Sequence, residues 1–441
     1  MLDAEEQRFF RHLSVFSGPF TLEAAGVIGC PERSTAQASE LLARLTERHM
    51  VQCTEDGLLG STFSVFNTLR AFARERLNAE DTLDRVQARH TCYYTSFAIR
   101  EGWRMMGPDQ ARALLALRRA LPQLRAAFAE AVRLEDGEKC AEIAIMTRLF
   151  WMRTGDFAEG RDWLRIALDR AHASDAPCRL RIYLASSLAI IDAFAGRGPD
   201  ALASAHLADD LARTTQSHNL RALALFACAS ADYVTCRTQE GLVSSADGVE
   251  VARLAGDAWI LGNLLRVRAA IAHQAGNLAL AMTCCIKARS LLRRLGDAQA
   301  EAWVVLTRAY VARAQGERGR AMGLFADVLA LADRSRDRVA TVAALTGLAT
   351  VVYPSFSAER AARLCGVVDR AQRELAWSGG RGNQESYPAA VAALRSTLGE
   401  DAWAREWERG ARMTLQEATA AALALPHETW DGEVDQEQAG A

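Results

Sequence analysis

The sequence has no long apolar run and no excess of charge of either sign. Its 52 Lys and Arg residues are balanced by 54 Asp and Glu residues, which gives a formal net charge of −2. A chain with this balance has no overall field that would attract nucleic acid or a membrane surface. It contains neither a stretch of about 18 consecutive apolar residues nor a charged and then apolar leader with a cleavage site. We therefore expect a cytoplasmic protein that does not bind membranes.

The usual signatures of metal, cofactor and catalytic sites are missing as well. The 10 cysteines are irregularly spaced, without a C-x-x-C pair or a Cys/His cluster at zinc-ligand spacing. This pattern predicts free, mostly buried thiols and no metal site. The phosphate-binding motif G-x-x-x-x-G-K-[ST] and the nucleophile elbow G-x-S-x-G are both absent. The sequence thus predicts no cofactor and no catalytic residue.

What the sequence does contain is an internal repeat with a period of about 40 residues. Gly196, Gly276 and Gly316 lie in three similar turn segments, and Cys236 occupies the corresponding position in a fourth. Small residues recur seven positions before and five positions after these turns: Ala189, Ala229, Ala269 and Ala309, then Ala201, Gly241, Ala281 and Ala321. Aspartates recur with the same period: Asp257, Asp297 and Asp337. Small side chains let paired helices cross closely, so each repeat is predicted to be a helix pair that stacks on its neighbours in a solenoid.

The first 80 residues carry a different pattern. Residues 3–16 and 22–28 are predicted helices, and Ser34 with Gln37 forms a possible capping box at the start of a third helix. Two short β-type runs around Asp56 and the following glycine predict a hairpin, after which TLRAFARERL predicts a further helix. Helices and a hairpin in this order predict a winged-helix domain, and β-structure is expected only in the first 70 residues.

Both parts resemble known families. The helix pairs are similar to the tetratricopeptide repeat, although the period of about 40 residues exceeds the 34 of that family. The segments LDAEEQRFFRHLSVFSGPFTLEAA, LLARLTERHMVQ and FNTLRAFARERL resemble the winged-helix segment of bacterial STAND regulators, which are signalling ATPases of the AfsR and LuxR-associated type. In that family the winged helix follows a nucleotide-binding domain and precedes a repeat sensor. The resemblance implies the winged-helix and sensor part of such a transcriptional regulator, without the nucleotide-binding domain.

These patterns predict a mostly α fold, in which an N-terminal winged helix is followed by a tetratricopeptide-like α-solenoid. The expected divisions are a winged helix in residues 1–80, helical repeats in 81–352, a C-terminal helical cap in 353–425 and a disordered acidic tail in 426–441.

A winged helix can read DNA or act as a structural spacer. Residues 1–80 hold eight arginines and eleven acidic residues. The helix at 34–49, which would enter a groove, carries Glu40 and Glu47 beside Arg44 and Arg48. Such a surface is poorly suited to phosphate contacts. The charge pattern therefore favours the spacer over DNA binding through this chain alone.

The candidate binding site is the inner face of the solenoid, because in tetratricopeptide-like pairs the first helix lines a concave groove. The positions expected there mix aromatic, basic and polar side chains: Tyr183, Phe226, Ser230, Tyr233, Asn263, Arg266, His273, Trp303, Tyr310 and Arg313. A mixed surface of this kind suits a peptide or a small polar-aromatic ligand. The alternative is that these side chains pack between repeats or face water.

A Gly-rich segment, SGGRGNQESY at 378–387, lies outside the repeats. It could form an anion-binding nest, but no Lys-Ser/Thr pair follows it. The segment is predicted to be a mobile loop.

Three functions follow from these observations. The first is a non-catalytic sensor or scaffold that binds a small-molecule inducer or a protein partner in the groove. The second is an enzyme in which the same groove holds and converts a small molecule. The third is a DNA-binding regulator that uses the winged helix. The absence of catalytic motifs and the acidic balance of the winged helix favour the first function.

Overall fold

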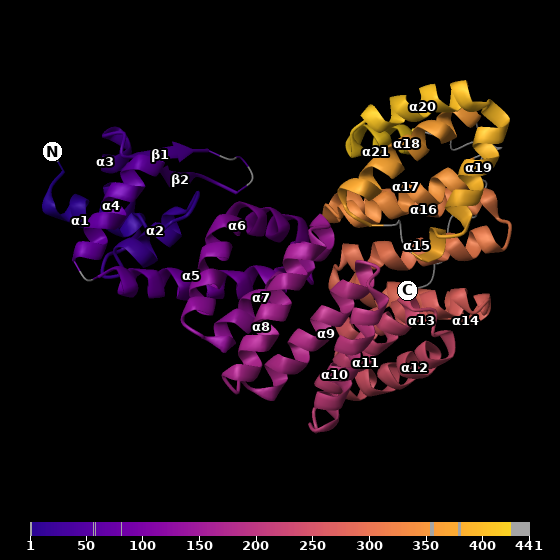
Figure 1. The fold of residues 1–441 in the computed structure, drawn as a ribbon, viewed down its shortest axis with the longest axis horizontal. Helices are drawn as coiled ribbons and strands as arrows, with labels where there is room; N and C mark the ends of the chain where they lie inside the picture. The colour runs from indigo at the N-terminus through magenta and orange to yellow at the C-terminus, as the bar shows by residue number, and fades with distance from the viewer. Residues whose placement is uncertain are drawn as a thin grey trace. The chain divides into compact units, whose positions relative to one another are not determined.

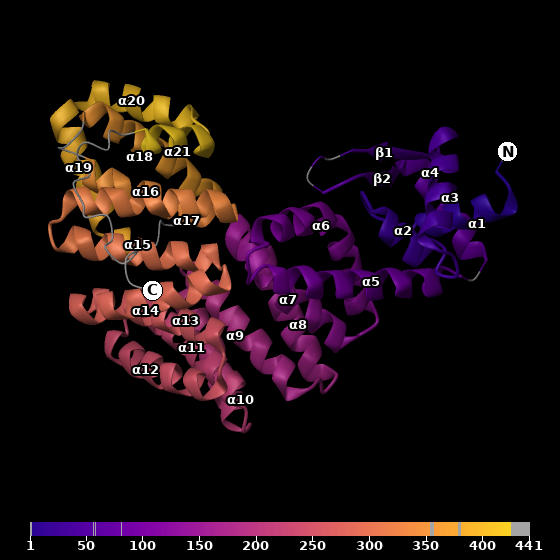
Figure 2. The same cartoon turned by 180° about the vertical axis from the view of Figure 1, so that it is seen from behind.

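The computed structural model describes residues 2–55, 57, 59–80, 82–352, 357–377 and 381–424. Within these ranges the chain is almost entirely helical, and its strands lie near the N-terminus (Figures 1 and 2). The chain divides into two compact units. Unit 1 contains Met1–Met105, Asp109–Phe150 and Trp163–Leu180, and unit 2 contains Met106–Pro108, Trp151–Asp162 and Arg181–Ala441. None of the helices described is both long enough and apolar enough to span a membrane.

The N-terminal part of unit 1 is a winged helix. It consists of α1 (Ala4–Leu13), α2 (Leu22–Gly29), α3 (Thr35–Glu47), β1 (Val51–Thr54), β2 (Thr62–Val65) and α4 (Asn67–Ala79). The strands pair antiparallel, with Val51 opposite Val65. The predicted capping box is present, because Ser34 Oγ accepts a hydrogen bond from Gln37 N and Gln37 Oε1 accepts one from Ser34 N. Asp56, at the predicted hairpin turn, lies outside the described residues. The predicted winged-helix order of elements is confirmed.

The turn between α1 and α2 is held by a helix that follows the winged helix. Unit 1 continues with α5 (Leu83–Arg104) and α6 (Gln110–Arg133), and it includes most of α7 (Gly137–Thr154) and α8 (Phe157–Ala173). The buried side chain of Gln123 on α6 accepts a hydrogen bond from Ser17 N at 3.0 Å and donates one to Gly18 O at 2.8 Å. The winged helix is thus packed into one unit with the helices after it, and the division at residue 80 stays a prediction.

Unit 2 contains the predicted repeats, in which inner and outer helices alternate (Figure 1). The inner helices are α9 (Cys178–Phe194), α11 (His218–Val234), α13 (Ala258–Gln274), α15 (Ala298–Ala314) and α17 (Arg338–Val351). The outer helices are α10 (Gly198–Arg213), α12 (Thr238–Ala255), α14 (Leu278–Leu295) and α16 (Arg318–Ser335). Inner helices pack directly on one another in sequence, α11 on α13, α13 on α15 and α15 on α17.

The repeated residues have the roles that their period predicts. The turns after α9, α11, α13 and α15 have φ values of 74°, 60°, 75° and 80° at Gly196, Cys236, Gly276 and Gly316. This left-handed conformation favours glycine, so Cys236 is the unfavourable residue of the four. The alanines before the turns, Ala189, Ala229, Ala269 and Ala309, are all 0% exposed. Asp257, Asp297 and Asp337 each accept a hydrogen bond from the backbone N–H three residues later and so cap α13, α15 and α17. The mostly α fold with a repeat of about 40 residues is confirmed.

The C-terminal part of unit 2 covers the end of the stack. It consists of α18 (Ala358–Glu374), the short 3₁₀ turn η1 (Arg381–Asn383), α19 (Ser386–Leu398), α20 (Glu400–Arg412) and α21 (Leu415–Leu423). Residues 378–380 and the predicted disordered tail, 426–441, lie outside the described residues. The mobile-loop prediction is wrong for η1, because the side chain of Asn383 is only 1% exposed and packs against the inner helices.

Candidate functional site

Nine of the ten predicted site residues lie on three consecutive inner helices. Helix α11 carries Phe226, Ser230 and Tyr233, α13 carries Asn263, Arg266 and His273, and α15 carries Trp303, Tyr310 and Arg313. The tenth, Tyr183, lies near the start of α9. Because α11, α13 and α15 pack side by side, residues that are 40 positions apart in the sequence become neighbours.

Five of these residues form a connected group, which we call the inner cluster: Tyr233, Arg266, His273, Tyr310 and Arg313. The rings of His273 and Tyr310 are 6.0 Å apart, and the Arg313 guanidinium lies 5.0 Å from the Tyr310 ring centroid. Arg266 lies 6.0 Å from the ring of Phe226 and interacts electrostatically with Tyr233. The cluster therefore combines two phenols, two guanidinium groups and an imidazole.

Burial shifts the pKa values in this cluster and so determines which of its side chains are charged. It raises the pKa of Tyr233 to about 12, with smaller opposing effects from Arg381 and Arg266. Burial also lowers the pKa of Arg266 to about 10, against the attraction of Asp297. The pKa of His273 is lowered by burial and by the Arg313 guanidinium. At neutral pH the tyrosines keep their hydroxyl protons, the imidazole is neutral and the arginines are charged, so the cluster offers hydrogen-bond donors and two positive charges.

Two of the remaining predicted residues, Ser230 and Asn263, make hydrogen bonds within their own helices. Ser230 donates its hydroxyl hydrogen bond to Phe226 O on the preceding turn of α11. Asn263 donates to Trp259 O and accepts from Arg266 Nε. These contacts agree with the alternative that some side chains of the inner helices stabilise the repeats and do not bind a ligand.

The inner helices curve enough for non-neighbours to meet. Phe194, the last residue of α9, lies 5.2 Å from Trp303 on α15 in an edge-to-face contact, although α11 and α13 intervene in the stack. On the other side, Trp303 lies 6.4 Å from Trp377, which follows α18. Trp377 is 6% exposed. Aromatic rings from α9, from α15 and from the residues after α18 therefore meet at Trp303.

Sequence reasoning missed the C-terminal residues that reach this interior. Arg313 Nη1 donates to Thr350 Oγ1 at 2.9 Å and to Asn383 Oδ1 at 3.1 Å, and Arg313 Nη2 donates to Gly382 O. The sequence GRGN in the Gly-rich segment could have indicated this contact, because a glycine lets its backbone approach another chain segment closely.

A buried charged group in unit 2 was missed as well. Arg153, in the last turn of α7, is 0% exposed, and the carboxylates of Asp297 and Asp337 both act on it. Burial raises the pKa of Asp337, and the positive charge of Arg153 opposes that shift. Within unit 2, this group brings the charge of Arg153 near the starts of α15 and α17.

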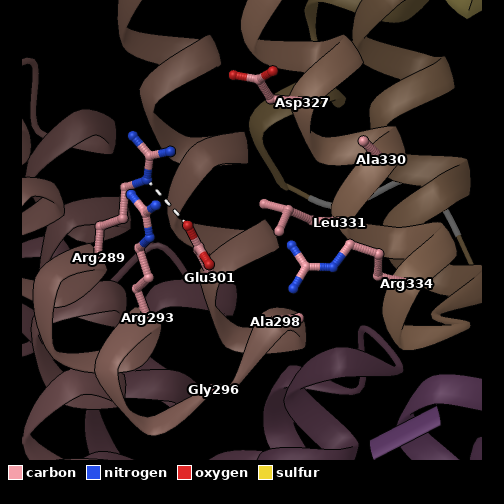
Figure 3. A pocket seen from close by; sticks show the side chains of 9 residues that line it. All are labelled: Arg289, Arg293, Gly296, Ala298, Glu301, Asp327, Ala330, Leu331 and Arg334. Carbon is pink, nitrogen blue, oxygen red and sulfur yellow. Dashed lines mark hydrogen bonds and ion pairs between the residues drawn. The ribbon is translucent and has the colours of Figure 1, made fainter. Parts of the chain in front are cut away.

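A pocket of about 510 Å³ lies between α14, α15 and α16, and none of the predicted site residues lines it (Figure 3). Arg289, Arg293 and Arg334 line it, and Arg289 Nε lies 3.2 Å from Glu301 Oε1. Asp327 adds a second carboxylate to the lining, so the arginine charge is largely balanced. In the described part of the chain, no group of three His, Cys, Asp or Glu side chains could hold a metal ion.

The winged helix presents little free positive charge at α3. Glu6 on α1 has a side chain that is 1% exposed, and it lies 2.7 Å from Arg48 and 3.5 Å from Arg44. Arg44 of α3 and Arg48, which follows its last residue, are thus already paired with a buried carboxylate.

Comparison with known proteins identifies the N-terminal domain. Residues 2–78 match the family described as the winged helix-turn-helix domain. These residues form a winged helix-turn-helix domain. A protein of Mycobacterium tuberculosis and one of Mycobacterium bovis, each provisionally named an HTH-type transcriptional regulator, are 25% identical to the chain over 350 residues. The match covers 76% of this chain and 38% of each relative. The predicted resemblance to winged-helix regulators is confirmed.

Two solved structures are similar in their general arrangement of helices. A STAND protein with a tetratricopeptide repeat sensor from Pyrococcus horikoshii is 15% identical, and the match covers 96% of this chain and 66% of that one, with a TM-score of 0.44. A Rap protein complexed with Competence and Sporulation Factor is 9% identical, with 75% of this chain and 99% of that one covered and a TM-score of 0.48.

Proposed function

We propose that this chain is a non-catalytic sensor of a transcriptional regulator, and that its inner cluster binds a peptide, a small-molecule inducer or a segment of a protein partner. The observation that carries the proposal is the convergence of Tyr233, Arg266, His273, Tyr310 and Arg313 from three successive inner helices. Buried aromatic and arginine side chains are the residues that contribute most to binding at interfaces.

The chemistry of the cluster defines the class of ligand. Two guanidinium groups and two tyrosine hydroxyls are hydrogen-bond donors, so they fit carbonyl, carboxamide or carboxylate oxygens. Trp303 and Phe194 form an apolar surface next to them, which fits an aromatic or aliphatic side chain. A peptide supplies both kinds of group at regular spacing.

The test is a selection from a displayed library of random peptides of about 12 residues, followed by affinity measurements on purified chain. We expect selected peptides to lose at least about a hundredfold in affinity for the Tyr233→Ala/Arg313→Ala variant, because two half-buried anchors are removed. Arg320→Ala is the matched control. Arg320 lies on outer helix α16 in a half-exposed pair with Glu317, so this variant should bind like the wild type.

Thermal melting of each variant checks that the repeats remain folded. Selected peptides that bind the folded double variant as tightly as the wild type would overturn the assignment of the inner cluster. Failure to select any peptide, together with no ligand detected by native mass spectrometry after incubation with a metabolite extract, would overturn the sensor function itself.

A further inference from the structure

The inner cluster already has an occupant, which is part of the chain itself. Trp377 packs on Trp303, and η1 (Arg381–Asn383) lies against Tyr310 and Arg313. We call Trp377 together with η1 the inserted segment. It follows α18 and precedes α19, so it reaches the inner helices from the C-terminal end of the chain.

Asn383 makes the most complete set of contacts. Its Nδ2 donates to Tyr310 Oη at 3.0 Å and to Ala343 O at 3.3 Å, and its Oδ1 accepts from Arg313 Nη1. Both ends of the carboxamide are therefore recognised, and Asn383 is 1% exposed. An amide of this kind is satisfied only by a site that offers a donor and an acceptor together.

Gly382, the residue before Asn383, fits its site because it has no side chain, and its backbone carbonyl forms a hydrogen bond. A Cβ added to Gly382 would lie 2.3 Å from Cε2 of the Tyr310 ring, so only glycine fits in this position. Gly382 O accepts from Arg313 Nη2. Arg381 reaches in the opposite direction and donates through Nη2 to Cys236 Sγ in the α11–α12 turn. Three consecutive residues thus contact three different repeats.

We propose that the inserted segment is an intramolecular competitor for the ligand site, so that the chain binds its external ligand only when this segment leaves the inner cluster. The proposal rests on the function assigned above to the same residues. It also narrows the ligand to an extended peptide that presents a carboxamide after a glycine or another residue without a bulky side chain, with an aromatic group nearby.

The expected size of the effect follows from competition. A segment tethered within the same chain acts at an effective concentration in the millimolar range. If it occupies the site about 99% of the time, the apparent affinity for an external ligand falls about a hundredfold. A substitution that weakens the binding of the inserted segment to the inner cluster should therefore raise the apparent affinity for the external ligand, although it adds no contact to that ligand.

The test uses a fluorescently labelled peptide with the sequence of residues 375–386, LAWSGGRGNQES. The recipient is the full chain with Gly382→Val/Asn383→Ala, which places a side chain against Tyr310 and removes the carboxamide. We expect this variant to bind the peptide at least about tenfold more tightly than the wild type. Adding Arg313→Ala should abolish that binding, because Arg313 contacts both the carbonyl and the carboxamide.

Gln384→Ala is the matched control, because Gln384 is exposed and its side chain accepts a hydrogen bond from Arg381. This variant should bind the peptide like the wild type. If the double variant does not fold, Asn383→Ala alone is used, and it should still bind the peptide more tightly than the wild type.

Two outcomes separate this inference from the proposed function. If the folded variants gain no affinity for the peptide while library-selected peptides still depend on Tyr233 and Arg313, the inserted segment is a structural part of the repeat stack and the inference is wrong. If neither kind of peptide depends on Arg313, the ligand site itself is assigned wrongly.

Discussion

At the scale of single residues, Gln123 and His90 determine how the winged helix is held. Gln123 uses both ends of its carboxamide for the turn at Ser17 and Gly18, and its Oε1 also lies 2.9 Å from His90 Nε2. For this contact to be a hydrogen bond, Nε2 must carry a proton and donate it. His90 is 0% exposed, so no solvent competes for these groups, and burial favours the uncharged imidazole.

The charge state of His90 predicts a pH-dependent stability of unit 1. Burial lowers the pKa of His90 from 6.5 to about 4, with Arg74 acting in the same direction and the hydrogen bond to Gln123 and the charge of Glu130 acting against it. Below pH 6.5 the unfolded chain binds a proton that the folded chain does not, so stability falls as pH falls towards 4. This contribution amounts to about 2 kcal/mol lost at pH 5.

Hydrogen exchange of peptides from α5 and α6 at pH 7 and pH 5, corrected for intrinsic rates, measures this loss. His90→Gln is the matched variant, since its amide can still donate to Gln123 but does not titrate. The free energy of opening, calculated from the protection factors, should fall between pH 7 and pH 5 by about 2 kcal/mol less in the variant than in the wild type. Equal losses in the two proteins would show that His90 does not control the stability of this unit.

At the scale of helices, the repeated aspartates have unequal roles despite their equal spacing. Asp257 caps α13 and is half-buried, whereas Asp337 caps α17, is 1% exposed and faces Arg153. Replacing a capping aspartate by alanine costs about 1 kcal/mol. Asp337→Ala also removes one of the two carboxylates whose charge acts on the buried Arg153 guanidinium, so its loss includes more than a helix cap. We expect Asp337→Ala to destabilise unit 2 by clearly more than Asp257→Ala.

Denaturant unfolding of both variants, followed by tryptophan fluorescence, gives the comparison. Similar losses for Asp257→Ala and Asp337→Ala would mean that both aspartates act as helix caps and no more.

The same contrast shows what the sequence could predict. The period of about 40 residues predicts the turns at Gly196, Gly276 and Gly316. This is possible because the helices of each repeat cross in the same way and need small residues at the same positions. It also brings the residues of the inner cluster together. It does not predict the charge that acts on Asp337, because Arg153 lies outside the regular repeats and precedes Asp337 by more than 180 residues.

The inserted segment illustrates a second limit. A Gly-rich stretch such as that around Gly382 favours a loop in any local reading. Its burial arises from contacts with Tyr310 and Arg313, which precede it by about 70 residues. Such long-range contacts leave no periodic signal in the sequence.

At the scale of the whole molecule, the question is whether the winged helix binds DNA. The net charge is −2, and Glu6 holds Arg44 and Arg48 of α3. Non-specific DNA binding depends on the number of phosphates that basic side chains neutralise. We expect the chain at about 100 µM to leave a duplex of random sequence unretarded in a gel at about 150 mM salt. Non-specific dissociation constants at such salt are typically about 1–100 µM, so this result would mean DNA binding weaker than the usual non-specific binding.

Glu6→Gln provides the sharpest form of this test. Without the charge of Glu6, Arg44 and Arg48 each lose one ion-pair partner. DNA binding should then appear at low salt, with a salt dependence that corresponds to about two additional phosphates. Arg44→Ala/Arg48→Ala in the same background should remove it. The opposite outcome is that the wild type binds DNA tightly and with a strong salt dependence, and that Arg44→Ala/Arg48→Ala loses this binding. In that case α3 contacts DNA directly, and the ligand site of unit 2 would regulate a DNA contact made by this chain.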